Sequence, residues 1–161
     1  TCEWVRSGKP TVLGIVTGMV AGLGTITPAS GYVGPLGGLL IGISAGVVCY
    51  FATQYIKRGL KIDDSLDVFP VHGVGGALGC LLTAVFYSNS FGGLQPADEV
   101  YSISSQFGVQ AIGVVATVVW CAVITFFILK LVDMMVGLRV AEDEETEGLD
   151  IVLHNERGYN I

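Results

Sequence analysis

Charged side chains are scarce in this sequence of 161 residues. Asp, Glu, Lys and Arg make up 14% of the residues, against about 25% in typical globular proteins. Hydrophobic residues make up 52%, which excludes an intrinsically disordered chain. Eight Lys and Arg residues against fourteen Asp and Glu residues cannot easily supply the basic face that nucleic-acid binding requires, so we expect no nucleic-acid partner.

Cysteine motifs and catalytic motifs are also missing. The four cysteines, Cys2, Cys49, Cys80 and Cys121, have neither CxxC nor Cys/His spacing, so we expect neither a disulfide scaffold nor a metal site. The apolar segments contain no HExxH motif and no Ser/His/Asp set, and nothing in the sequence indicates a cofactor. An intramembrane enzyme is therefore poorly supported, and we expect a protein that is not an enzyme.

Long uncharged runs are what the sequence has instead. No charged residue occurs from Pro10 to Ile56, a run of 47 residues, whereas one membrane span needs about 20. This run predicts two spans joined by a turn rich in Pro and Gly. With two further apolar stretches, we expect four spans, at about 11–27, 34–56, 67–87 and 105–132. The predicted fold is an all-α, polytopic transmembrane helix bundle, because four buried helices of a soluble protein would need much more polar chain.

The basic residues predict the orientation in the membrane. All loops and ends on one side of the predicted spans carry Lys or Arg, and the turn at 27–35 and the loop at 88–105 carry none. The basic side is expected to be cytoplasmic. Residues 1–136 would then form the transmembrane domain, and the acidic segment 137–161 a cytoplasmic tail. Such a tail is either only solvated or docks onto its own membrane domain or a partner.

The 23 glycines follow a four-residue spacing in three of the four spans. These stripes let helix backbones approach closely in lipid, and helix packing is the role we expect for them. The fourth span has no stripe and is rich in Val, Ile and Phe, so it is expected to be an outer helix facing lipid. The stripes comprise Gly14, Gly18 and Gly22 in the first span, Gly34, Gly38, Gly42 and Gly46 in the second, and Gly75 and Gly79 in the third.

His72 is the only strongly polar, titratable side chain well inside a predicted span. An ionisable group within a membrane is costly and indicates a functional site by default. Asp67 lies five residues earlier, where it is better placed as a helix N-cap than as a counter-ion, and Pro70 falls in the first helical turn. The alternative is a packing histidine hydrogen-bonded to a neighbouring backbone carbonyl.

Several motifs together resemble one known family. They are Gly8-Lys9-Pro10-Thr11, Ile26-Thr27-Pro28-Ala29-Ser30-Gly31, Asp67-Val68-Phe69-Pro70-Val71-His72-Gly73-Val74-Gly75-Gly76, Gly137-Leu138-Arg139-Val140 and the tail from Gly148-Leu149-Asp150 through His154 to Tyr159. In this order and over essentially the whole chain, they resemble the ammonium transporter family, which is related to the Rhesus proteins.

The resemblance implies an eleven-helix fold assembled as a homotrimer in the plasma or inner membrane. This chain, which begins at Thr1 without an initiator Met, looks like the C-terminal part of a longer protein: helices eight to eleven and the cytoplasmic tail. The implied substrate is ammonium or ammonia, crossing a hydrophobic pore. An alternative is an assembly and regulatory module, with conduction supplied by helices outside this chain.

The resemblance also assigns roles to individual residues. It makes His72 one of two pore histidines and Val68 an inner pore-lining residue, and it gives Asp64 a structural role at the inner helix end. Asp67, Gly75 and Gly76 are expected near the pore. The tail would couple neighbouring subunits and could meet a PII-type signalling protein, through Gly137, Arg139, Gly148, Asp150, His154 and Tyr159. Asp150–His154 lacks the Thr that is phosphorylated in some plant members, which speaks against that regulation here.

Overall fold

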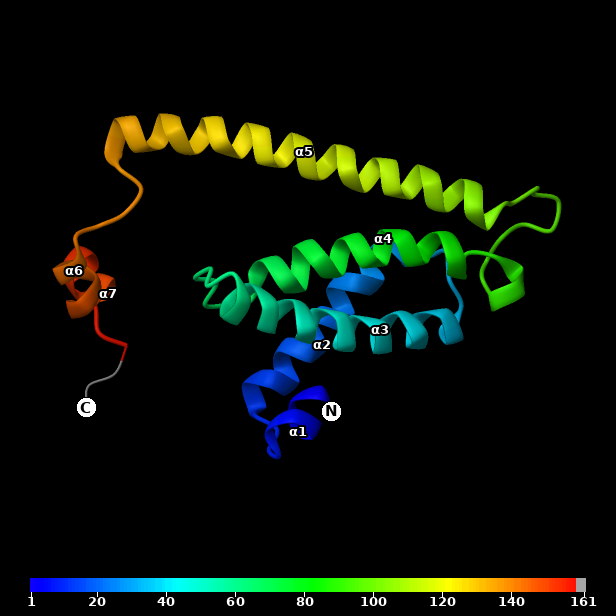
Figure 1. The fold of residues 1–161 in the computed structure, drawn as a ribbon, viewed down its shortest axis with the longest axis horizontal. Helices are drawn as coiled ribbons and strands as arrows, with labels where there is room; N and C mark the ends of the chain where they lie inside the picture. Colours follow the sequence, from blue (N-terminus) through cyan, green and yellow to red (C-terminus); the bar gives the residue numbers. More distant parts are fainter. Residues whose placement is uncertain (159–161) are drawn as a thin grey trace. The chain divides into compact units, whose positions relative to one another are not determined.

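The computed structural model describes residues 1–158, and every regular element in that part of the chain is a helix (Figure 1). Tyr159 lies outside the described residues. The chain divides into two units, residues 1–116 and residues 117–161, and each is described by itself. The helices are α1 (Cys2–Ser7), α2 (Val12–Ile26), α3 (Pro35–Gln54), α4 (Gly75–Phe86), α5 (Ile103–Val136), α6 (Glu142–Glu147) and α7 (Leu149–His154).

Within residues 1–158, four helical segments are long and apolar enough to cross a membrane, which confirms the predicted number of spans. Three of them contain a turn of another helix type: a 3₁₀ turn, Thr27–Ala29, follows α2, a π-helical turn, Tyr55–Gly59, follows α3, and a second, Phe69–Val74, precedes α4. The spans are Val12–Ala29, Pro35–Gly59, Phe69–Phe86 and Ile103–Val136.

The first two spans start at residues suited to a helix N-terminus. The Thr11 side chain accepts a hydrogen bond from the Gly14 N–H at 3.0 Å, as a capping residue does. Thr11 is itself held by α1, because its N–H and its hydroxyl both donate to the Glu3 carboxylate at 3.0 Å. The second span starts with Pro35, whose missing N–H costs nothing in the first turn.

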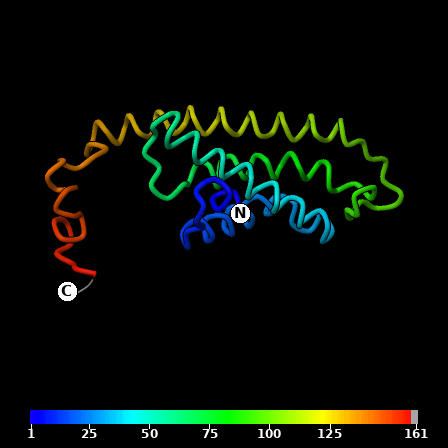
Figure 2. Tube along the Cα trace, turned by 60° about the horizontal axis from the view of Figure 1, so that its bottom comes forward, coloured from blue at the N-terminus to red at the C-terminus, as the bar shows by residue number. Residues whose placement is uncertain are grey.

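In the first unit, α2, α3 and α4 pack against one another (Figures 1 and 2). The buried residues recur every four positions on each helix, and most of them are small. Lipid tails are as apolar as hydrophobic side chains, so hydrophobicity alone does not drive helices together in a membrane. Small residues stabilise the contact instead, because they let the three backbones approach closely. The residues with this spacing are Ala21, Thr25 and Ala29 on the first span, Gly37, Ile41, Ala45 and Cys49 on the second, and Val71, Gly75, Gly79 and Thr83 on the third; Ile56, Pro70 and Ala84 are buried beside them.

The predicted glycine stripes therefore coincide with the helix contacts only in the third span. A carbon added at Gly18, Gly22, Gly42 or Gly46 would meet no described atom within 4 Å beyond its own helix surroundings. Gly38 approaches only the end of the Ile26 side chain, at 3.8 Å. Within this chain, these five glycines do not hold the helices together, and a packing role for them remains a prediction.

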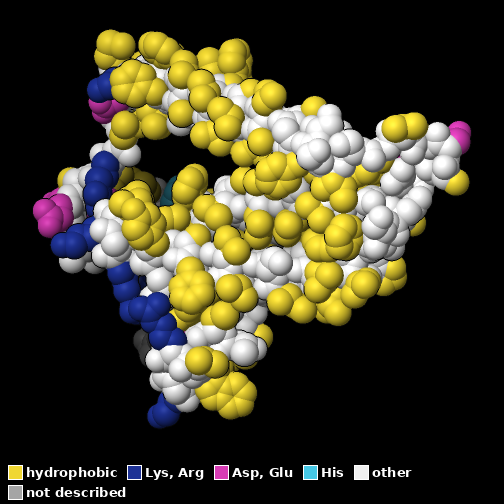
Figure 3. Space-filling view, turned by 45° about the vertical axis from the view of Figure 1, so that its right-hand side comes forward, with side chains coloured by type: hydrophobic (Ala, Val, Ile, Leu, Met, Phe, Trp, Pro, Cys, Tyr) yellow, Lys and Arg dark blue, Asp and Glu magenta, His cyan; other side chains and the backbone are white. Residues whose placement is uncertain are grey.

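The fourth span, α5, is 34 residues long, or about 50 Å at 1.5 Å per residue, against a hydrocarbon core of about 30 Å. None of its residues is buried. Figure 3 shows hydrophobic side chains spread over the surface of the helices. In the second unit, the tail contains α6 and α7, which contact each other.

Candidate functional site

The segment that carries His72 is a π-helical turn, Phe69–Val74, a form that often occurs at functional sites. Its start is held by Asp64, whose carboxylate accepts hydrogen bonds from the Val68 N–H at 2.8 Å and the Phe69 N–H at 2.9 Å. Pro70 is at one of the first two positions of the turn, where its missing N–H is tolerated. A capped, proline-initiated turn therefore fixes the backbone just before His72.

The prediction that Asp67 caps this helix is wrong, because Asp64 does so. Asp67 has a φ of 56°, an uncommon conformation for a residue with a side chain. Its carboxylate lies 2.6 Å from the Lys57 ammonium group and is 14% exposed. The pair joins the end of the second span to the start of the third. The Asp67 carboxylate is thus paired with Lys57 of the second span. It does not accept hydrogen bonds from the backbone N–H groups at the start of the third span.

His72 lies on the accessible side of its turn, whereas the preceding residue, Val71, is buried with Ala21 and Cys49. The imidazole lies beside the α2 backbone: a carbon added at Gly24 would be 3.9 Å from His72 Nδ1. Among the described residues, no hydrogen bond to the His72 side chain is seen, so the alternative of a carbonyl-bonded packing histidine has no support here. Val68, four residues earlier, is 52% exposed.

The glycines that follow His72 differ in their surroundings. A carbon added at Gly75 would lie 2.8 Å from Thr25 Oγ1 and 3.2 Å from Cys49 Sγ, and one at Gly79 would collide with the Thr25 carbonyl oxygen. At Gly76 it would meet no atom within 4 Å. Gly75 and Gly79 therefore bring the His72 helix close to α2, and Gly76 leaves space on another side.

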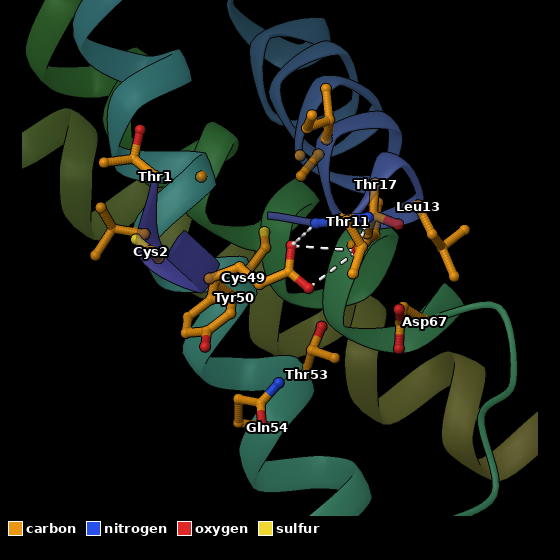
Figure 4. Close-up of a pocket in the computed structure, with 18 of the residues that line it drawn as sticks. Thr1, Cys2, Thr11, Leu13, Thr17, Cys49, Tyr50, Thr53, Gln54 and Asp67 are labelled. Atoms are coloured by element: carbon orange, nitrogen blue, oxygen red, sulfur yellow. Dashed lines mark hydrogen bonds between the residues drawn. The ribbon is translucent and has the colours of Figure 1, made fainter. Parts of the chain in front are cut away.

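A cavity of about 610 Å³ lies beside this helix, mainly between α2 and α3 (Figure 4). Gly14, Gly18, Gly42 and Gly46 are among its lining residues. The Glu3 carboxylate lies against Gly14, and the other three glycines leave open space within this chain. Its polar lining includes Thr17, Tyr50, Thr53, Gln54, Lys57 and Asp67.

Sequence reasoning missed the polar side chains that the second span contributes to this cavity. Tyr50, Thr53, Gln54 and Lys57 follow the spacing of one helical face. That spacing, at the end of an otherwise apolar span, was the signal that could have found them.

In the second unit, the tail is folded around one ion pair. Arg139 Nε donates to Glu145 Oε1 at 2.5 Å, and Arg139 Nη2 donates to Glu145 Oε2 at 2.7 Å. This bidentate contact lowers the pKa of the Glu145 carboxyl from its ordinary value of 4.5. The side chain of Arg139 is 75% exposed and that of Glu145 is 32% exposed, so the pair contributes little to stability.

The remaining predicted tail residues are at the turns around the two short helices. Gly137 and Gly148 have φ of 79° and 108°, a region that favours glycine. Asp150 is in the first turn of α7, and His154 is its last residue. Within the described part of the tail, the structure brings together Arg139 and Glu145 and leaves His154 at the far end of α7.

The sequence profile of the Ammonium Transporter Family matches residues 1–159. This chain belongs to the ammonium transporter family. That membership agrees with the resemblance seen in the sequence motifs, and the family is named for a transport activity, not for an enzymatic reaction.

Curated members of the ammonium transporter family align with nearly the whole chain. An ammonium transporter of Aquifex aeolicus is 45% identical over 99% of this chain and 37% of its own length. One of Bacillus subtilis is 39% identical over 98% of this chain and 39% of its own length. Ammonium transporter Amt1 of Archaeoglobus fulgidus is 41% identical over 97% of this chain. The chain thus spans less than two-fifths of the length of these relatives.

The fold is also shared with a solved structure. A structure described as a Sensor Amt Protein superposes with a TM-score of 0.82 at 31% identity, over 92% of this chain and 36% of that one. The helical architecture described above is therefore that of part of an ammonium transporter.

Proposed function

We propose that this chain is part of an ammonium transporter subunit and that His72 and Val68 line its conduction path. The carrying observation is the accessible His72 imidazole on a capped π-helical turn, in a chain that belongs to the ammonium transporter family. Val68 supports the assignment, because it is exposed and precedes His72 by about one helical turn.

The chemistry of this path follows from an imidazole in apolar surroundings. A charged group at the bilayer centre costs several kcal/mol or more, so ammonium gives up its proton before or at the dry part of the path, and ammonia crosses as a neutral molecule. The proton is returned to the outer solution or is carried across separately. A neutral imidazole donates from one nitrogen and accepts at the other, which suits such a polar guest. Potassium has no proton to lose and is rejected.

The proposed path has a defined orientation in the membrane. The Lys57 side of the membrane domain is cytoplasmic, and so is the C-terminal tail, because the basic residues are confined to the loops and ends on that side of the spans. The protein is then a multi-pass protein of the plasma or inner membrane, and ammonium moves toward the side that carries the Lys57–Asp67 pair.

Uptake of labelled methylammonium by the full-length polypeptide tests the role of His72. We expect His72→Ala to change the uptake rate and to weaken the exclusion of potassium, at an unchanged surface level. His154→Ala is the matched control, because it removes the other histidine of the chain from outside the spans, and it should leave potassium exclusion intact. An unchanged rate together with unchanged exclusion in His72→Ala would contradict the role.

A second function is favoured by the folded tail: it regulates the transporter by coupling subunits of a homotrimer. The Arg139–Glu145 contact and the pair of helices α6 and α7 give the tail a defined surface to present to a neighbouring subunit or to a PII-type signalling protein. Deletion of residues 141–161 tests this. Loss of uptake with the trimer and the surface level intact supports coupling, and unchanged uptake contradicts it.

A further inference from the structure

The Lys57–Asp67 pair lies next to Val68, the inner residue of the proposed path. Asp67 directly precedes Val68 in the chain, and Lys57 and Asp67 both line the cavity beside the His72 helix (Figure 4). Lys57 Nζ lies 2.6 Å from Asp67 Oδ1, and the Asp67 side chain is only 14% exposed. A carboxylate so little hydrated attracts a cation more strongly than one in bulk water. Asp67 therefore holds firmly whichever cation lies beside it.

The backbone keeps the Asp67 carboxylate in this place. The Asp67 N–H donates to the Asp64 carbonyl oxygen at 3.3 Å, and the Asp67 carbonyl oxygen accepts from the Val71 N–H at 3.0 Å. The chain turns between these two bonds through the φ of 56° at Asp67. An uncommon backbone conformation persists only where its surroundings fix it. Asp67 thus has little freedom to turn away if its partner is lost.

The other carboxylates held near this end of the spans have neutral partners. The Glu3 carboxylate accepts from the N–H and the hydroxyl of Thr11, and the Asp64 carboxylate accepts from two backbone N–H groups. Within residues 1–116, Lys57 with Asp67 is the one ion pair seen. Removal of the Lys57 charge would therefore free one carboxylate, that of Asp67, and leave the others with their partners.

A free carboxylate at this position would retain the transported ion. On the proposed function, ammonia that reaches water at the inner end of the path takes up a proton from the solvent and becomes ammonium. Ammonium and the end of the Lys57 side chain are the same kind of group, a charged nitrogen whose N–H bonds donate. They compete for the same carboxylate, and the tether gives Lys57 a high effective concentration.

We propose that Lys57 occupies Asp67 so that this carboxylate does not hold an ammonium ion at the inner end of the path. Lys57 thereby speeds the release of the transported cation, in addition to joining the second and third spans. The identity of the cation rests on the proposed function. The competition between Lys57 and a small ammonium-type cation for Asp67 rests on the geometry of the pair.

Binding of labelled methylammonium to the purified full-length polypeptide tests this competition without relying on transport. At a concentration that leaves the wild type less than half saturated, Lys57→Gln and Lys57→Met should each bind about two- to fivefold more methylammonium, because each frees Asp67. Lys57→Gln keeps N–H donors and Lys57→Met keeps the apolar stem, so one variant tests the inference if the other does not fold. Lys57→Arg keeps the charge and should bind as the wild type does.

A double variant and a matched control make the binding result specific. Lys57→Gln combined with Asp67→Asn removes the freed carboxylate and should return binding to the wild-type level. Arg58→Gln is the control, because Arg58 is the adjacent basic residue and lines the same cavity, and no ion pair of Arg58 is seen among residues 1–158. Wild-type binding in Lys57→Gln and Lys57→Met, or an equal gain in Arg58→Gln, would overturn the inference.

Uptake kinetics give a second readout, which a merely structural defect would not produce. When release limits turnover, the maximal rate and the KM fall by the same factor, whereas a smaller number of folded molecules lowers only the maximal rate. We expect the joint decrease in Lys57→Gln and not in Arg58→Gln. A decrease of the maximal rate alone in Lys57→Gln would contradict a role in release.

Failure of this inference can be told from failure of the proposed function. A protein that takes up no methylammonium, but binds more of it in Lys57→Gln than in the wild type, contradicts the transport role and leaves the competition for Asp67 standing. Normal uptake together with unchanged binding in Lys57→Gln contradicts the role of Lys57 alone.

Discussion

At the scale of single residues, the approach of the His72 helix to α2 depends on two glycines. Gly75 faces the Thr25 hydroxyl and the Cys49 sulfur, and Gly79 faces the Thr25 carbonyl oxygen. A backbone carbonyl on a packed helix cannot turn aside as the end of a long side chain can. The position of His72 relative to α2 therefore rests on two places where no side chain fits.

Gly79→Ala is expected to destabilise the protein by about 1–3 kcal/mol, the usual cost of overpacking, less up to about 1 kcal/mol of helix propensity gained. Unfolding of the full-length polypeptide by titration with a denaturing detergent measures this. Gly108→Ala in α5 is the control, since a carbon added there meets no described atom within 4 Å. Equal stability of the two variants would contradict the packing role of Gly79.

Asp64 makes a second prediction at this scale. Removing a capping carboxylate costs about 0.5–2 kcal/mol, so Asp64→Ala should lower the free energy of unfolding by that amount and loosen the turn before His72. Asp64→Asn keeps an acceptor oxygen and should lose less. Asp63→Ala is the control, because the one hydrogen bond seen to the Asp63 carboxylate among residues 1–158 comes from the Ser65 hydroxyl, at 3.2 Å. Hydrogen exchange at the Val68 and Phe69 amides reports the loss of the cap directly.

At the scale of helices, sequence patterns predicted the number of spans but not the faces through which the helices contact one another. Hydropathy predicted four spans because a charged side chain is too costly in lipid to interrupt one, and the described part of the chain contains four such helical segments. The four-residue spacing of small residues did not reveal which face of a helix meets its neighbours. In the first span, Gly14, Gly18 and Gly22 share that spacing with Ala21, Thr25 and Ala29, and the second set is buried.

The mistaken cap has a similar origin. Asp64 and Asp67 both precede the helix that carries His72, and spacing alone favours the nearer one. The choice depends on a backbone conformation at Asp67 and on Lys57, which is ten residues away along the chain. Neither is visible in the local sequence. The cavity residues of α3 were missed for another reason, because Tyr50, Thr53 and Gln54 carry no charge and do not interrupt an apolar run.

The tail pair gives a prediction that depends on pH. Because Arg139 lowers the pKa of Glu145, the stabilisation is fully present above the ordinary value of 4.5 and is lost as the pH falls through the lowered pKa. We expect the NMR signal of Arg139 Nε to shift only at more acidic pH than an unpaired glutamate would require. Glu145→Gln should abolish this titration and Glu147→Gln should not. A transition at or above pH 4.5 would contradict the pairing.

On the scale of the whole molecule, the charge differs between the loops at the two ends of the spans, and on the proposed orientation this difference distinguishes the two sides of the membrane. The loop at 60–68 carries basic and acidic residues, among them Asp67, which pairs with Lys57 at the end of the second span, whereas the loop at 88–102 carries Asp98 and Glu99 and no basic residue. The two loops are at opposite ends of α4 and its preceding turn. On the proposed orientation, a cation would approach from the loop at 88–102, which has no basic residue. It would arrive at the loop at 60–68, where the Asp67 carboxylate is already paired with the Lys57 ammonium group.

Cysteine labelling tests this sidedness. In a background without the four native cysteines, an impermeant maleimide should label Ser90→Cys in intact cells and Ser65→Cys only after the membrane is opened. Both positions are exposed in the structure, so access to the reagent depends on the side of the membrane. The reverse pattern would contradict the orientation, and with it the direction of transport.

The close contact at Gly79 also has a genetic consequence. Every amino-acid replacement of glycine adds at least one carbon, so no missense change in that codon preserves the distance to the Thr25 carbonyl oxygen. At most positions in a membrane helix, at least one substitution has little effect on stability, so related sequences can differ there. At Gly79 there is no such substitution. We therefore expect Gly79 to be replaced only together with a compensating change in α2, on the side that faces it.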